Sequence, residues 1–162
     1  MSDQIGVKIT FKGSDNSLKV QKNYFCNGIL ERAKLERAYL IEANLEGANL
    51  QGANLIGAKL ARAKFERSKL ERAKLERAYL IEANLVGAYL IEANFQGANL
   101  KWTYLIGANF KDANLKEANL ERAQHLSLDQ LSTVKTLLNS KLDNEFLITL
   151  KKKYPALFKV SD

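Results

Sequence analysis

The chain has 162 residues, a formal net charge of +7 and a single cysteine, Cys26. This length suits one domain with a core of its own, and one cysteine excludes an internal disulfide framework and a multi-cysteine metal site. No apolar run is long enough for a membrane-spanning helix, and the polar start over residues 1–4 is unlike a signal peptide, so we expect a cytoplasmic protein and no membrane partner.

Residues 1–22 are predicted to form an N-terminal β-hairpin cap. Apolar residues alternate with other residues over 5–11, the turn-rich run 13–17 comes next, and a second short apolar stretch follows at 18–20. Alternation with a period of two is typical of a strand, and a run of Gly, Ser, Asp and Asn between two strands favours a turn. We expect this hairpin to pair with or cover the first coil of the segment that follows.

A five-residue repeat occupies residues 23–124. From Phe25 to Leu120 every fifth residue, here called the centre, is Leu or Phe, and the residue two before it is Ala at 16 of 18 positions from Ala33 on. A step of five scatters side chains around an α-helix and alternates them between the faces of a strand. Only a coil that turns by a constant angle per pentad points every centre inward.

The number of pentads per coil is indicated by a duplication. Residues 30–45 and 70–85 have the same 16-letter sequence, and their starts are 40 residues apart. A coil of four pentads divides this offset and a coil of three does not, so four sides are favoured. Six of the nine glycines stand two residues after a centre, where the chain is expected to turn a corner and glycine is least strained.

The run from Ala43 to Leu50, ANLEGANL, resembles the A-(D/N)-L-x-x signature of the pentapeptide-repeat family. The resemblance covers about residues 23–124. It implies a mainly β fold, a right-handed quadrilateral β-helix of about five coils, and a non-enzymatic scaffold. Some members of this family imitate DNA and bind gyrase with an acidic rod, and the charge of +7 disfavours that role of topoisomerase-directed DNA mimic here.

Residues 125–162 are predicted to form a C-terminal cap of two helices. Ser127 to Gln130 read as a capping box, with Leu126 and Leu131 placed as a hydrophobic staple. The first helix is expected to bury one face, and the second to start near Asp143 and end before Pro155. The inward residues of the two helices are predicted to be Leu131, Val134, Leu137 and Leu138, then Phe146, Leu147, Leu150 and Tyr154. The tail is similar to helical tails on some cyanobacterial members.

The sequence offers little for catalysis. His125 is the only histidine, so no histidine relay or cluster exists, and Cys26 is expected to be an inert, partly buried thiol. No glycine-rich phosphate loop occurs. Carboxylates occupy outward positions on a regular rod, which lacks the cleft that shifts a catalytic pKa. We therefore expect no enzyme activity, no cofactor and no bound metal.

Stacking at an offset of 20 residues predicts an apolar patch on the fourth face of the coil, here called the fourth-face patch. Its members are Tyr39, Ile41, Ala61, Tyr79 and Ile81. Exposed apolar patches often mark interfaces. The duplication alone also accounts for the repeated Tyr and Ile, and β-prone residues suit a sheet surface. Trp102 and Tyr104 are outward aromatic residues that extend this surface or simply pack on it.

A second feature is a belt of positive charge over residues 58–77, with a local charge of +5. This basic belt consists of Lys59, Arg62, Lys64, Arg67, Lys69, Arg72, Lys74 and Arg77. Basic stripes bind phosphate backbones. This one encircles the rod, and Glu66, Glu71 and Glu76 alternate with its arginines and are expected to pair with them across coils, so a solvated surface is favoured.

The sequence therefore predicts a rigid rod that presents flat faces to a protein partner or to its own copy. The alternative is nucleic-acid binding through the basic belt, which we do not expect. The partner, the pathway and the oligomeric state are not specified by any pattern in the sequence.

Overall fold

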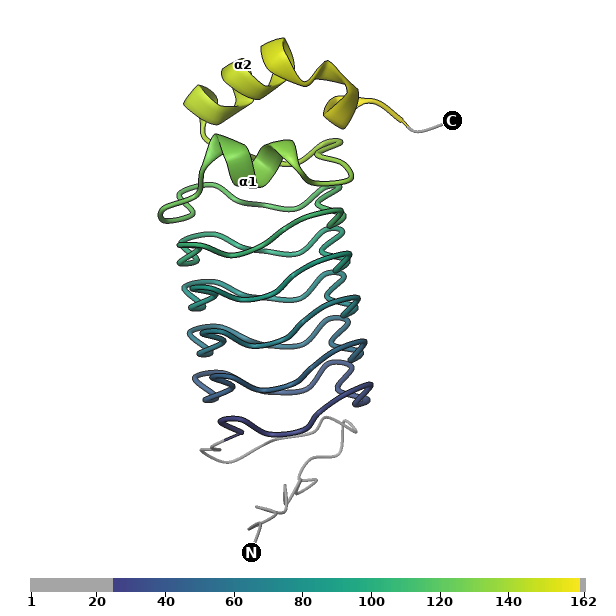
Figure 1. Cartoon of the computed structure of the whole chain (residues 1–162), viewed down its shortest axis with the longest axis vertical. Helices are drawn as coiled ribbons and strands as arrows, with labels where there is room; N and C mark the ends of the chain where they lie inside the picture. Colours follow the sequence, from purple (N-terminus) through teal and green to yellow (C-terminus); the bar gives the residue numbers. More distant parts are fainter. Residues whose placement is uncertain (1–24, 161–162) are drawn as a thin grey trace, which may run out of the picture.

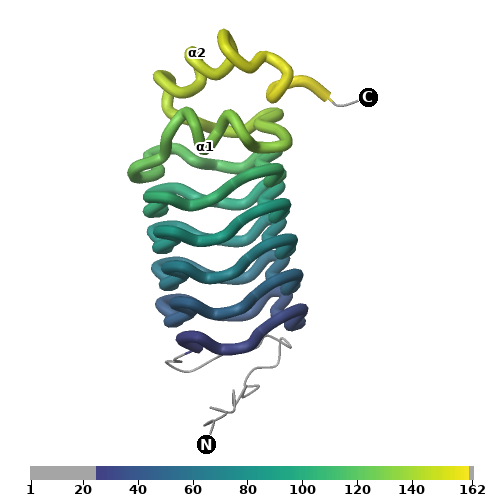
Figure 2. Tube along the Cα trace, viewed as in Figure 1, coloured from purple at the N-terminus to yellow at the C-terminus, as the bar shows by residue number. Residues whose placement is uncertain are grey.

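The computed structural model describes residues 25–160 as a rod of stacked coils with helices at one end (Figure 1). Successive turns of the chain lie one above another along the long axis, and the helical end is opposite the end where residue 25 lies (Figure 2). The hairpin predicted for residues 1–22 lies outside the described residues.

Parallel bridges join residues that are 20 positions apart. The residue before each centre bridges to its equivalent in the next coil, from Ile29↔Asn49 through to Tyr104↔Gln124. Backbone bonds on each side complete the ladder, with Leu30 N donating to Asn49 O at 2.7 Å and Asn49 N donating to Gly28 O at 2.9 Å. Each coil therefore contains four pentads, which confirms the offset read from the duplication.

The interior of the rod is a continuous column of the repeated apolar side chains. All centres from Phe25 to Leu120 are buried, and Leu75 is 0% exposed. The two exceptions to the small alanine, Ser68 and Thr103, are also fully buried. Their hydroxyls donate to the carbonyls three residues earlier at 2.8 and 2.7 Å, so neither polar group is left without a partner. The inward assignment of the centres is confirmed.

The corner residue, two after each centre, adopts a positive φ. The six corner glycines lie at φ +62° to +66°, as the sequence predicts, but non-glycine corners such as Arg77 share this conformation. A left-handed conformation costs an L-residue about 1–2 kcal/mol. Arginine stems lie over the next corner, since a Cβ added at Gly97 would be 3.5 Å from Arg77 Cγ.

Helix α1 (Leu128–Ser132) begins at the predicted capping box. Ser127 Oγ accepts from Gln130 N at 3.2 Å, and Gln130 Oε1 accepts from Ser127 N at 2.9 Å. Leu126 and Leu131, the predicted staple, are both buried. The Gln130 amide also donates to the carbonyls of Leu105 and Ala108 at 2.8 Å each, so the cap of the helix is tied to the coil below it.

The prediction of a longer first helix with Leu131, Val134, Leu137 and Leu138 on one face is wrong. Helix α1 ends at Ser132, and the chain then resumes the coil, with bridges Asn114↔Thr136 and Asn119↔Lys141. Val134 and Leu137 are buried in this resumed coil, whereas Leu138 is only partly buried. The backbone groups on the edge of the last coil explain the change, since Asp112 N finds its acceptor at Thr133 O, 2.9 Å away.

Helix α2 (Asn144–Lys153) lies across the end of the rod and is followed by the short 3-10 helix η1 (Pro155–Phe158). It begins after Asp143 and ends before Pro155, as predicted. Leu150 is buried and Phe146 and Leu147 are partly buried against the core. Tyr154, predicted to point inward, is 40% exposed because it is already the C-cap, where the helical periodicity has ended.

Candidate interaction surfaces

The structure places the fourth-face patch as the register predicts. Tyr39, Lys59 and Tyr79 are bridged in one column, so the two tyrosines lie two coils apart. Ile41 and Tyr79 are 49% and 45% exposed, while Tyr39, Ala61 and Ile81 are partly buried. The ammonium of Lys59 lies 3.5 Å from the centroid of the Tyr79 ring. The patch is therefore an apolar surface that includes one cation, Lys59. This residue is also a member of the basic belt.

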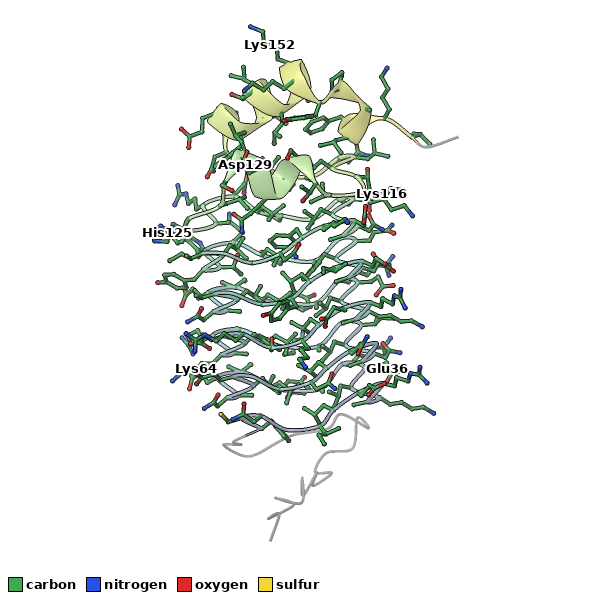
Figure 3. The ribbon with its side chains drawn as sticks, viewed as in Figure 1. Glu36, Lys64, Lys116, His125, Asp129 and Lys152 are labelled. Carbon is green, nitrogen blue, oxygen red and sulfur yellow. The ribbon has the colours of Figure 1, made fainter. Side chains whose placement is uncertain are left out.

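The basic belt runs around the rod. Lys64, Lys69 and Lys74 precede centres on three successive faces, and Figure 3 shows Lys64 on the opposite side of the rod from Glu36. Arg62 pairs with Glu42 at 2.7 Å and Arg72 with Glu92 at 2.8 Å, each across one coil. Within residues 25–160 the remaining belt cations form no ion pair. These are Lys59, Lys64, Arg67, Lys69, Lys74 and Arg77, of which all but Lys59 are exposed.

The hydrogen bond from Arg72, followed by its charge, lowers the pKa of Glu92. The same bond raises the pKa of Arg72. Both groups are exposed, so solvent screens this pair and its effect on stability is small.

The glutamates of the belt do not pair with its arginines, which corrects the sequence-based expectation. Asn84 and Asn94 donate to Glu66 and Glu76 at 2.6 and 2.7 Å, each from the next coil. In the described part of the chain, Glu66, Glu71 and Glu76 each have one carboxylate oxygen that is buried without a hydrogen-bond partner. Glu66 and Glu76 therefore lie beside asparagines of the next coil, whereas the belt arginines, at the corners, are exposed.

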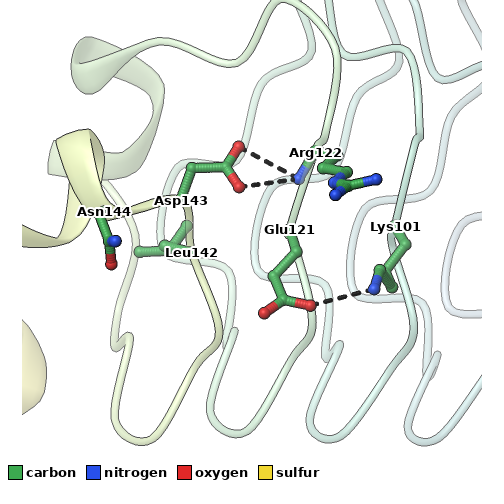
Figure 4. Close-up of a pocket in the computed structure, with 6 residues that line it drawn as sticks. All are labelled: Lys101, Glu121, Arg122, Leu142, Asp143 and Asn144. Carbon is green, nitrogen blue, oxygen red and sulfur yellow. Dashed lines mark hydrogen bonds and ion pairs between the residues drawn. The ribbon is translucent and has the colours of Figure 1, made fainter.

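A polar hollow of about 400 Å³ lies where the last coil meets the start of α2 (Figure 4). Both carboxylate oxygens of Asp143 accept from Arg122 N, at 3.2 and 3.1 Å, and Lys101 Nζ lies 3.1 Å from a Glu121 oxygen. The hydrogen bond from Lys101, followed by its charge, lowers the pKa of Glu121. Glu121 is thus paired with Lys101, and Asp143 with a backbone amide of the coil, so the hollow is a polar junction between coil and helix.

The two residues considered for chemistry are both on the surface. Cys26 is exposed, where a partly buried thiol was expected, because it follows the first described centre and points outward. His125 is exposed at the junction between coil and helix (Figure 3). Over residues 25–160 no three His, Cys, Asp or Glu side chains gather as a metal site, and no helix is long and apolar enough to cross a membrane.

The repeat matches a known family of proteins. The family model described as pentapeptide repeats matches eight copies in four overlapping spans, 29–67, 58–97, 68–105 and 93–124. Together these spans extend from residue 29 to residue 124, which is more than half of the chain. The chain belongs to the pentapeptide-repeat family. No curated protein matches it.

Solved structures of other pentapeptide-repeat proteins are similar to this one. HetL from the cyanobacterium Nostoc sp. strain PCC 7120, involved in heterocyst differentiation regulation, is 28% identical with a TM-score of 0.48 over 76% of this chain and 61% of HetL. QnrB1, a plasmid-mediated fluoroquinolone resistance protein, is 21% identical with a TM-score of 0.44 over 75% of this chain and 71% of QnrB1. A protein of the Arabidopsis thaliana thylakoid lumen is 19% identical with a TM-score of 0.31, over 76% and 74% of the two chains. This pentapeptide-repeat chain thus spans less than two thirds of the length of HetL.

Proposed function

We propose that this pentapeptide-repeat chain is a non-enzymatic interaction module, a right-handed rod of about five coils with a cap at each end. The fourth-face patch is its contact surface for a protein partner or for a second copy. The observation that carries this proposal is the alignment of Tyr39 and Tyr79 in one bridged column, with Ile41 half exposed beside them. Aromatic and aliphatic side chains on a surface built from regular backbone make a contact area that loses little conformational entropy on binding.

The test replaces Tyr79 and Ile81 together by glutamate. Two charges in the centre of an apolar interface would each have to be desolvated, so self-association or partner capture should be lost. The chain supplies a matched control, because Tyr89 and Ile91 have the same sequence context on the opposite face and Tyr89 is 46% exposed. The Tyr89→Glu, Ile91→Glu variant should keep every complex that the wild-type protein forms. Equal binding by the two variants would refute the fourth-face assignment.

The alternative function is nucleic-acid binding by the basic belt. Its support is that most of the belt cations are exposed and form no ion pair within the described residues. Phosphate binding by these cations would weaken steeply with salt. It would also be lost when Lys59, Lys64 and Lys69 become glutamate, and the absence of a mobility shift at low salt would exclude it.

A further inference from the structure

The pentad that begins at Leu100 departs from the rest of the repeat on its outer surface. Trp102 is the corner residue, at φ +63°, whereas every other corner from Asn27 to Arg122 is Gly, Asn, Asp, Glu or Arg. Trp102, Tyr104 and Ile106 are 38%, 46% and 49% exposed. The core does not require these side chains, since Leu100 and Leu105 already fill it. A bulky ring held in a left-handed conformation at the surface is the kind of local conflict that functional sites retain.

These aromatic residues line a surface hollow of about 450 Å³, here called the corner hollow. Its lining residues are Arg62, Glu82, Trp102, Tyr104 and Gln124. Arg62, Glu82 and Trp102 are corners of successive coils on the fourth face, and Tyr104 and Gln124 are bridged neighbours on the adjacent face. The hollow therefore combines two rings, a carboxylate and an amide along one edge of the rod.

The charges of the corner hollow leave one carboxylate without a partner. Arg62 is committed to Glu42, 2.7 Å away in the preceding coil. Arg122 lies with its guanidinium 4.8 Å from the centroid of the Trp102 ring and is not among the residues that line the hollow. The Glu82 carboxylate is exposed and forms no ion pair or side-chain hydrogen bond with any residue between 25 and 160. The groups left to bind a ligand are thus an anion and aromatic rings.

Carboxylates and aromatic rings both attract cations, and a guanidinium satisfies both at once. It is planar, stacks on a ring and forms two parallel hydrogen bonds to a carboxylate, whereas an ammonium acts as a compact, strongly hydrated charge. The contact of Arg122 with Trp102 already shows that this indole accepts a guanidinium. The net charge of +7 opposes a basic ligand only at long range, because salt screens exposed charges beyond about 8 Å.

We propose that the corner hollow binds an arginine side chain of a partner protein, with its guanidinium paired to Glu82 and stacked on Trp102 or Tyr104. The proposal rests on the function of the chain as an interaction module and adds the chemical class of group that it recognises. The corner hollow adjoins the fourth-face patch but shares none of its five residues, so the two assignments are tested by different substitutions.

Trp102 is the only tryptophan of the chain, so its fluorescence reports directly on the hollow. The full-length protein is titrated with a short acetylated and amidated Gly-Arg-Gly peptide and with the same peptide carrying neutral citrulline in place of arginine, and calorimetry provides the second measurement. We expect saturable binding of the arginine peptide and none of the citrulline peptide. The Glu82→Gln variant should bind the arginine peptide about tenfold or more weakly, since a hydrogen bond to a charged group contributes about 1.5–3 kcal/mol.

The matched control is Glu117→Gln, which removes a carboxylate from the same corner position on another face, at φ +59°. This variant should bind the arginine peptide as the wild-type protein does. Three results would overturn the proposal: no saturable binding by either method, equal affinity for the citrulline peptide, or an affinity unchanged by Glu82→Gln. None of these results would decide the fourth-face assignment, which is tested by the Tyr79→Glu, Ile81→Glu variant.

Discussion

The replacement of Leu75 by alanine tests the packing of the rod most directly. Leu75 is 0% exposed, and its coil is held on both sides by ladder bonds of 2.7 Å, from Leu55 N to Lys74 O and from Leu75 N to Asn94 O. These bonds limit how far the walls can collapse into the space left by the missing side chain. Burying Ala in place of Leu costs about 2–5 kcal/mol, and a wall that cannot relax places the cost in the upper part, about 3–5 kcal/mol.

Urea unfolding followed by far-ultraviolet circular dichroism measures this cost. With a slope of about 1–3 kcal/mol per molar urea, the midpoint should fall by about 1 M or more. Lys74→Ala changes the neighbouring, exposed side chain and should stay within about 0.5 kcal/mol of the wild-type protein. Leu75→Arg, which buries an unpaired charge, should abolish the cooperative transition. If Leu75→Ala and Lys74→Ala unfold at the same midpoint, the column of inward centres does not hold the rod together.

Three further changes probe the corner, the cap and the junction. Gly97→Ala should destabilise the fold by about 1 kcal/mol in the same unfolding assay. A left-handed alanine costs about 1–2 kcal/mol, and the lower entropy of the unfolded chain offsets about 0.4–1 kcal/mol of this. The added Cβ makes only an ordinary contact with Arg77. Gln130→Ala removes three hydrogen bonds to backbone groups and should cost about 2–4 kcal/mol, measured as faster hydrogen exchange in α1; unchanged protection there would contradict the cap. Lys101→Met should raise the pKa of Glu121 towards its ordinary value in an NMR titration. The lowered pKa of Glu121 stabilises the wild-type fold at a pH above the ordinary pKa of a glutamate, and this contribution is lost as the pH falls through the lowered pKa. The variant lacks this contribution, so its stability should fall less in acid than that of the wild-type protein.

Most of the rod follows from the sequence because one rule repeats in it. A step of five residues is incompatible with a buried face on a helix or a strand, so the centres from Phe25 to Leu120 specify a coil by themselves. Corner glycines such as Gly97 mark the turns, and the duplicated segment indicates four sides. The start of α1 at Ser127 was also predictable, because its capping box depends on local hydrogen bonding within one turn. The start of α2 after Asp143 was predicted as well, although the Asp143 side chain accepts from Arg122 N and makes no cap hydrogen bond.

The segment after helix α1 was not predicted, because its structure is decided by the coil below it. Leu131, Val134 and Leu137 have helical spacing, but donors on the edge of the last coil need acceptors that a helix does not offer. A signal was present: Leu137-Leu138-Asn139-Ser140-Lys141 has the order of a pentad, with Asn139 at φ +57° in the corner position. It was missed because its register is offset by two residues from the main repeat, with bridges spanning 22 positions instead of 20.

The sequence predicts where the surface residues lie, but not all of the contacts that their side chains make. Register alone places Tyr79 in the fourth-face patch, whereas the cation of Lys59 over its ring depends on side-chain conformation. The corner hollow was missed for the same reason. Glu82 and Gln124 are unremarkable in the sequence, and they gain significance only because Trp102 lies between coils that contribute a carboxylate and an amide.

The bridges between residues 20 positions apart make the rod a molecular ruler. Removing one complete set of four pentads from its middle shortens the spacing between the two ends by one strand layer, about 4.8 Å, and leaves every side chain on its original side. Removing three pentads instead would rotate everything beyond the deletion by a quarter turn. The number of pentads that are deleted or inserted therefore sets both the distance between two bound groups and the angle between them, and only whole sets of four change the distance alone.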